Sequence, residues 1–168
     1  MLLPLEQYPR DYAATQNNRG AAYWTLAEVR DKDKTLAQAI DAYEEALRVY
    51  TLEEYPVDYA MIQNNLGAAY WTLAEVKDKS GNLLKAVSAY EEALRVYTLD
   101  GYPVDYAMIQ NNLGAAYRSL AEVRERAANL SKAIKAYKEA LKIYTAERYP
   151  LYHKRVSASL DLAREMLE

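Results

Sequence analysis

A Tyr-Pro dipeptide recurs along the chain at an interval of 47 residues, and this spacing constrains the fold more than any other feature. It stands at positions 8–9, 55–56, 102–103 and 149–150. Residues 55–70 are identical to residues 102–117 at all 16 positions, and the two complete units agree at 31 of 47. Such self-similarity is typical of repeat proteins, in which each unit packs on the next. The sequence therefore predicts one domain, 1–168, with repeats at about 8–54, 55–101 and 102–148 and a final helix within 149–168.

Each unit is expected to form two helices, because its apolar residues return every three or four positions. In the second unit, Pro56 suits the first turn of a helix and Asp58 favours the positive end of its dipole. The first helix of this unit is predicted at about 56–77. The polar segment that follows breaks the pattern, so Asn82 is the expected N-cap of a second helix at about 83–97.

Side chains on these helices suggest how they pack. Glu91 and Arg95 have the spacing of an ion pair on the outside of the second helix. A single helix pair cannot cover its own apolar faces, so the pairs are expected to stack. Small residues recur where backbones would then approach closely, and we predict packing roles for Gly20, Gly67, Gly114, Ala39, Ala86 and Ala133.

The spacing of these residues resembles the tetratricopeptide repeat. The signature positions are matched by Leu66, Gly67, Tyr70, Ala86, Tyr90 and Ala93, and again by Leu113, Gly114, Tyr117, Ala133, Tyr137 and Ala140. The 47-residue unit with its Gln-Asn-Asn-Leu-Gly motif is similar to longer tetratricopeptide-like variants, and Gln63 and Thr98 replace the family's aromatic residue and proline. The resemblance implies an all-α fold, a right-handed α-solenoid of three antiparallel helical hairpins plus a C-terminal capping helix.

The resemblance also implies a binding site, because the first helices in such families line a concave groove that receives a peptide or protein segment. The asparagines that would contact a ligand in the groove are Asn18, Asn65 and Asn112, with Asn64 and Asn111 beside them. The alternative is that these amides bond neighbouring helices and fix the register of the stack. The basic residues of a carboxylate clamp would fall at Thr25, Thr72 and Ser119, so capture of a terminal carboxylate is not expected.

In each of the three units, one large side chain directly follows the signature tyrosine. Trp24, Trp71 and Arg118 are predicted to point into the groove, where tryptophan and arginine often anchor partners. The alternative is that they pack against the adjacent hairpin.

The sequence contains no catalytic or metal-binding constellation, so we expect no enzymatic activity, cofactor or metal site. There is no cysteine, and His153 is the only histidine, which leaves no nucleophile pair and no zinc site. The net charge of −3 disfavours nucleic acid as a partner, although residues 118–168 carry 11 basic against 7 acidic side chains. No apolar stretch is long enough to span a membrane, and a cytoplasmic location is expected.

These features favour a non-catalytic scaffold that binds a protein or peptide on the first helices. The alternative is a self-assembling structural protein, a homo-oligomer or filament, since near-identical repeats suit contacts between copies. At the C-terminal end, Asp161 replaces the glycine of the other units and is expected to form a polar cap. No such cap is expected at the N-terminal end, so an apolar face over residues 1–30 is predicted to support self-association.

Overall fold

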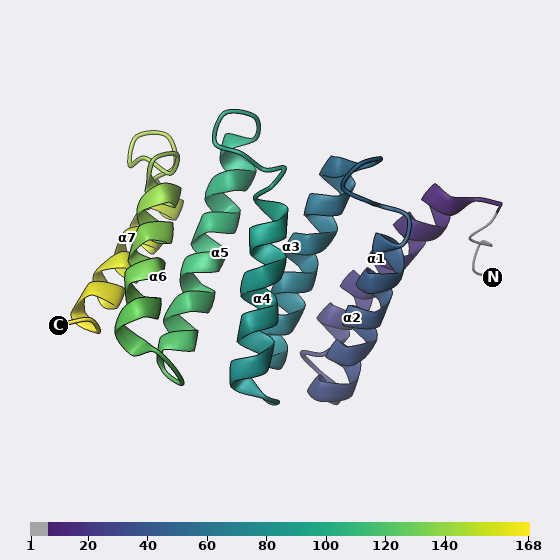
Figure 1. Cartoon of the computed structure of the whole chain (residues 1–168), viewed down its shortest axis with the longest axis horizontal. Coiled ribbons are helices and arrows are strands. Elements are labelled where there is room, and N and C mark those ends of the chain that lie inside the picture. Colours follow the sequence, from purple (N-terminus) through teal and green to yellow (C-terminus); the bar gives the residue numbers. More distant parts are fainter. Residues whose placement is uncertain (1–6) are drawn as a thin grey trace.

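The computed structural model describes residues 7–168, and this part of the chain forms seven α-helices and no strands. Figure 1 shows the helices side by side along the long axis of the molecule, with the first and last at opposite ends. In chain order they are α1 Pro9–Leu26, α2 Lys32–Leu47, α3 Pro56–Leu73, α4 Lys79–Ala93, α5 Pro103–Ala121, α6 Arg126–Leu141 and α7 Pro150–Glu165. The all-α fold class expected from the sequence is confirmed.

The Tyr-Pro dipeptides set the start of every odd-numbered helix. Tyr55 has an extended backbone with φ of −137°, and Pro56 is the first helical residue of α3. The same arrangement begins α1, α5 and α7. Proline is favoured at this position because its φ is already helical and its missing N–H would have no partner inside the helix. The predicted start of the first helix at residue 56 is therefore confirmed.

The predicted ends of the helices in the second unit are wrong by about one turn. The helix α3 ends at Leu73 rather than 77, and α4 begins at Lys79 rather than 83. The reason is Asp78, which adopts a left-handed backbone with φ of 35° and accepts a hydrogen bond from the Gly81 N–H at 3.1 Å. This residue, and not Asn82, is the N-cap of α4.

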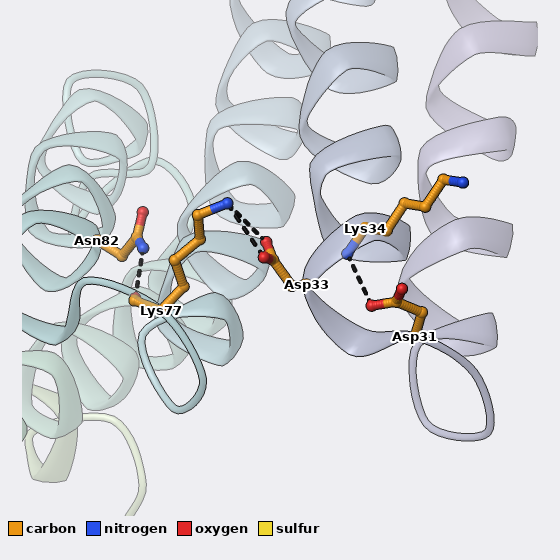
Figure 2. A network of polar contacts seen from close by, with 5 residues as sticks. All are labelled: Asp31, Asp33, Lys34, Lys77 and Asn82. Atoms are coloured by element: carbon orange, nitrogen blue, oxygen red, sulfur yellow. Dashed lines mark hydrogen bonds and ion pairs between the residues drawn. The ribbon is translucent and has the colours of Figure 1, made fainter.

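Asn82 has a different role from the one predicted. It lies buried inside α4, and its Nδ2 donates to the Lys77 carbonyl at 2.7 Å, which closes the turn between the two helices (Figure 2). Asn129 makes the same bond to the Arg124 carbonyl in the next unit, at 2.8 Å. The polar segment 79–82 is therefore the first turn of α4, and the buried Asn82 amide satisfies a backbone carbonyl of the loop that precedes it.

Consecutive helices pack along their lengths, as in a helical repeat protein. The connection between α1 and α2 spans only residues 27–31, so the two helices run antiparallel. Beyond these neighbours, α1 also approaches α3, α3 approaches α5, and α5 approaches α7 within 8 Å at their Cα atoms. Within residues 7–168 no such approach joins α2 to α4 or α4 to α6. The odd-numbered helices therefore lie on the inner side of the stack and the even-numbered helices on the outer side.

Glycines on the inner helices make the close packing possible. The Tyr90 ring of α4 lies against Gly67 of α3, where an added Cβ would come within 2.6 Å of Cε1 of that ring. Equivalent contacts join Tyr43 to Gly20 and Tyr137 to Gly114. The other predicted packing positions, Ala39, Ala86 and Ala133, have no exposed surface. Any side chain larger than hydrogen at the glycine would force a ring or a helix to move.

Polar contacts join one repeat to the next at the edge of the stack. Lys77, after α3, donates to the Asp33 carboxylate of α2 at 3.0 and 3.1 Å (Figure 2). Nearby, the Asp31 carboxylate accepts from the Lys34 N–H and caps α2. These ion pairs are exposed, so each contributes little on its own.

The predicted ion pair between Glu91 and Arg95 does not form. Arg95 pairs instead with Glu92 at 2.6 Å. The Glu91 carboxylate accepts a hydrogen bond of 2.7 Å from the Tyr117 hydroxyl of α5, and Glu44 accepts the matching bond from Tyr70 at 3.0 Å. Glu91 thus contacts the following repeat, and Arg95 takes the neighbouring Glu92 as its partner.

The first helix is more polar than expected. With the 47-residue offset, Thr15 and Arg19 of α1 correspond to Ile62 and Leu66, which α3 buries. Arg19 lies over the Tyr23 ring at 5.3 Å and covers part of its face. This end therefore combines polar positions with exposed apolar side chains such as Trp24 and Val29, and its self-association stays a prediction; residues 1–6 of the predicted segment lie outside the described residues. At the other end, Asp161 is exposed on α7.

Candidate binding surface on the inner helices

Two adjoining hollows run along the inner helices. The first has a volume of about 230 Å³ and lies between α1, α3, α4 and α5. Its walls are apolar for the most part, and they consist of Trp24, Ala68, Trp71, Thr72, Tyr90, Asn112 and Ala115. Trp24 is 38% exposed, and its Nε1 donates to the Thr72 hydroxyl at 3.4 Å, which fixes the indole beside the opening. We call this space the apolar hollow.

The second hollow, of about 380 Å³, lies between α3, α5, α6 and α7. It shares Trp71, Asn112 and Ala115 with the apolar hollow, so the two adjoin. Its further lining residues are Met108, Asn111, Arg118, Tyr137, Tyr144, Tyr152, Arg155, Val156 and Ser159. We call this space the arginine hollow. The geometry brings together four predicted groove residues from two different helices, namely Trp71, Asn111, Asn112 and Arg118.

Two N–H groups in this region lack an acceptor. Trp71 Nε1 and Arg118 Nε are fully buried and have no hydrogen-bond partner among the described residues. A buried donor without an acceptor costs about 1–3 kcal/mol. An acceptor supplied by a bound molecule would remove that cost, so both side chains favour a ligand rich in carbonyl or carboxylate oxygens.

The asparagines of the repeat bond to one another between helices. Asn65 Nδ2 donates to Asn17 Oδ1 at 3.1 Å, and Asn112 Nδ2 donates to Asn64 Oδ1 at 3.3 Å. Each bond joins the first asparagine of one unit to the second asparagine of the next. This geometry is the register-fixing arrangement, which stood as the alternative to ligand contact. Asn18 is exposed.

Several residues that line the arginine hollow were not predicted from the sequence. Arg155 and Tyr152 belong to α7, which the sequence indicated only as a cap. The repeat alignment contained a signal, because Arg155 introduces a charge at a position where the earlier units have Ala14, Met61 and Met108. Tyr152 stacks on Tyr144 with ring centroids 4.9 Å apart and forms one wall.

Charge is uneven in this hollow. Burial raises the pKa of the Tyr137 hydroxyl, while the nearby Arg118 guanidinium opposes that rise. No acidic side chain is found among the described residues that line either hollow. Within the described chain, neither Arg118 nor Arg155 forms an ion pair. The inner surface is therefore positive where α5 and α7 meet.

The outer side of the stack contrasts with this surface. A hollow of about 480 Å³ between α4, α5 and α6 contains both acidic and basic groups. Its carboxylates are already engaged, since Glu139 accepts from the Tyr106 hydroxyl at 2.9 Å and Glu91 from Tyr117. Lys132 lies over the Tyr117 ring at 5.2 Å. Because these groups satisfy one another, the inner hollows are the better candidates for a binding site.

Residues 67–97 match the tetratricopeptide repeat family. This segment is tetratricopeptide-like. The matched segment contains the end of α3 and all of α4, including the contact between Gly67 and Tyr90. A search of curated proteins returns no match. Tetratricopeptide repeats generally act as scaffolds for protein–protein interaction and are typically non-catalytic.

Two properties of the described chain concern other kinds of site. The described residues contain no group of three or more His, Cys, Asp or Glu side chains that could hold a metal ion. Among the helices within residues 7–168, none is both long enough and apolar enough to cross a membrane.

Proposed function

We propose that this chain is a non-catalytic scaffold that binds a peptide or protein segment on its inner helices. In this proposal the helices form a right-handed α-solenoid of three hairpins, with α7 as the cap. The observation that carries the proposal is the pair of adjoining hollows, in which Trp24, Trp71 and Arg118 from successive units line one continuous surface.

The composition of this surface supports peptide binding. Tryptophan and arginine are the side chains that contribute most binding energy at protein interfaces, particularly in desolvated pockets. Trp71 forms a wall of both hollows and has a buried N–H without an acceptor. An extended peptide has carbonyl groups at every residue, so it can supply the acceptor while its side chains fill the hollows.

We assign different roles to the asparagines. Asn111 and Asn112 line the arginine hollow and are proposed to contact the ligand. Asn64 and Asn65 take part in the bonds between helices, and we propose that they hold the inner helices in register. Asn18 belongs to the proposed surface by its position on α1 alone.

The alternative of a self-assembling protein has weaker support. An apolar contact between N-terminal ends would use exposed side chains such as Trp24 and Val29, but Thr15 and Arg19 of α1 are polar where α3 has buried apolar side chains. Light scattering on the purified chain distinguishes the two functions. A monomer over a wide range of concentration is expected, and a concentration-dependent dimer or filament would favour self-assembly.

A displayed library of random peptides tests the binding function directly. Peptides of about 12 residues are long enough, since they reach roughly 40 Å when extended. We expect the chain to enrich specific sequences, and Trp71→Ala to weaken their binding by on the order of tenfold or more. Lys138→Gln is the matched control, because Lys138 is exposed on α6 outside both hollows. The proposal is wrong if no peptide is enriched, or if the control weakens binding as much as Trp71→Ala.

A further inference from the structure

Two unpaired arginines meet at one end of the inner surface. Arg118 of α5 and Arg155 of α7 line the same hollow, and neither is paired with a carboxylate of the described chain. Two like charges in one partly enclosed space repel each other unless an anion lies between them. This end of the surface is therefore complementary to a negative group.

The chemistry of the Arg118 guanidinium indicates which negative group fits. Its Nε is fully buried and has no acceptor among the described residues. A guanidinium presents several N–H donors in one plane and binds the two oxygens of a carboxylate with parallel hydrogen bonds. The adjoining Trp71 Nε1 is a second unused donor, at the boundary with the apolar hollow.

The repeat itself makes the two hollows different. Position 118 is arginine, whereas the equivalent positions 24 and 71 are tryptophan. The first hollow consequently has two indole walls and no charged residue among its described lining, while the second has two arginines. Packed helices lie about 8–10 Å apart. At about 3.3 Å per residue of extended chain, neighbouring hollows are about three residues apart along a bound peptide.

We infer that the partner segment is an acidic peptide whose side-chain carboxylate binds Arg118 and Arg155 while an apolar side chain about three residues away fills the apolar hollow. This inference rests on the proposed peptide-binding function and adds the chemistry of the partner. It places specificity at position 118, where the third unit has arginine and the other two have tryptophan.

The sequences enriched from the peptide library test the inference. We expect an aspartate or glutamate at a fixed separation of about three residues from a large apolar residue. Enriched peptides are then synthesised with amidated C-termini, so that only side-chain carboxylates remain. Replacing the acid of such a peptide by its amide should weaken binding by roughly 10- to 100-fold, the effect of losing hydrogen bonds to a charged group.

Variants of the chain provide the reciprocal test. Arg118→Gln and Arg155→Gln should each remove most of the preference for the acidic peptide over its amide, whereas Lys138→Gln, which makes the same change in net charge, should leave it intact. Arg118→Trp introduces the residue that the other two units have at this position. It is expected to pack as they do, so it tests the inference if Arg118→Gln fails to fold. It too should lose most of the preference for the acidic peptide over its amide.

The outcomes separate this inference from the proposed function. Enriched peptides without a common acid, or with binding unchanged by the arginine variants, would overturn the inference and leave peptide binding in place. Peptides that bind only with a free C-terminus would also overturn it, since the carboxylate would then be terminal. A library with no enriched sequence would overturn both.

Discussion

The contact between Gly67 and Tyr90 gives the sharpest prediction about stability. A Cβ at Gly67 would lie 2.6, 2.8 and 2.9 Å from three carbons of the Tyr90 ring, and Tyr90 is only 3% exposed, so the ring cannot move aside into solvent. Overpacking of this kind costs about 1–3 kcal/mol. Alanine in place of glycine inside a helix gains up to about 1 kcal/mol. Since all three contacts are under 3.0 Å, the cost is expected in the upper part of that range, so Gly67→Ala should lower the free energy of unfolding by about 1–2 kcal/mol.

The sign of the effect should reverse when the ring is removed. In a Tyr90→Leu background the clash is absent, so Gly67→Ala should stabilise the protein by up to about 1 kcal/mol through helix propensity alone. Urea denaturation followed by circular dichroism measures all four proteins of the cycle. In a chain of this size, 1 kcal/mol corresponds to a shift in melting temperature of about 2–4 °C. If Gly67→Ala is as stable as the parent while Tyr90 is present, the packing argument is refuted.

Three other perturbations follow from individual contacts. The hydrogen bond from Tyr59 and the pair with Arg95 hold the pKa of Glu92 below its usual value, so these contacts stabilise the fold at neutral pH and their contribution is lost as pH falls through that lowered pKa. Between pH 7 and pH 3, Tyr59→Phe should therefore lose less unfolding free energy than the parent in denaturation experiments, and equal losses would contradict this. Glu125 has a left-handed backbone with φ of 45°, and its side chain makes no capping hydrogen bond. Glu125→Gly should therefore raise stability by about 0.5–1 kcal/mol, and a lower melting temperature would show that the backbone is not strained there. Asn65→Ala removes the bond to the preceding repeat and should lower stability by about 0.5–1.5 kcal/mol in thermal denaturation, whereas an unchanged melting temperature with weaker peptide binding would favour direct ligand contact.

Some of the candidate site could be predicted from the sequence. The repeat alignment placed Trp24, Trp71 and Arg118 at equivalent positions, and the structure puts them along one inner surface. The alignment could not show that Arg155 shares a hollow with Arg118, because that depends on how α7 packs against α5 and α6. Nor could it show which asparagine bonds to which, since the bonds between helices join different positions of successive units.

The sequence by itself determined where the odd-numbered helices begin and that each unit contains two helices. Proline and the three- and four-residue apolar spacing act through local sterics and local burial, so they can be recognised without knowledge of distant contacts. The start of α4 depended instead on the left-handed backbone of Asp78 and on the burial of Asn82, which the propensities of single residues do not reveal. Only the tertiary structure decided the chemistry of the inner surface, because unpaired charge and unused hydrogen-bond donors are defined by neighbours that lie in other repeats.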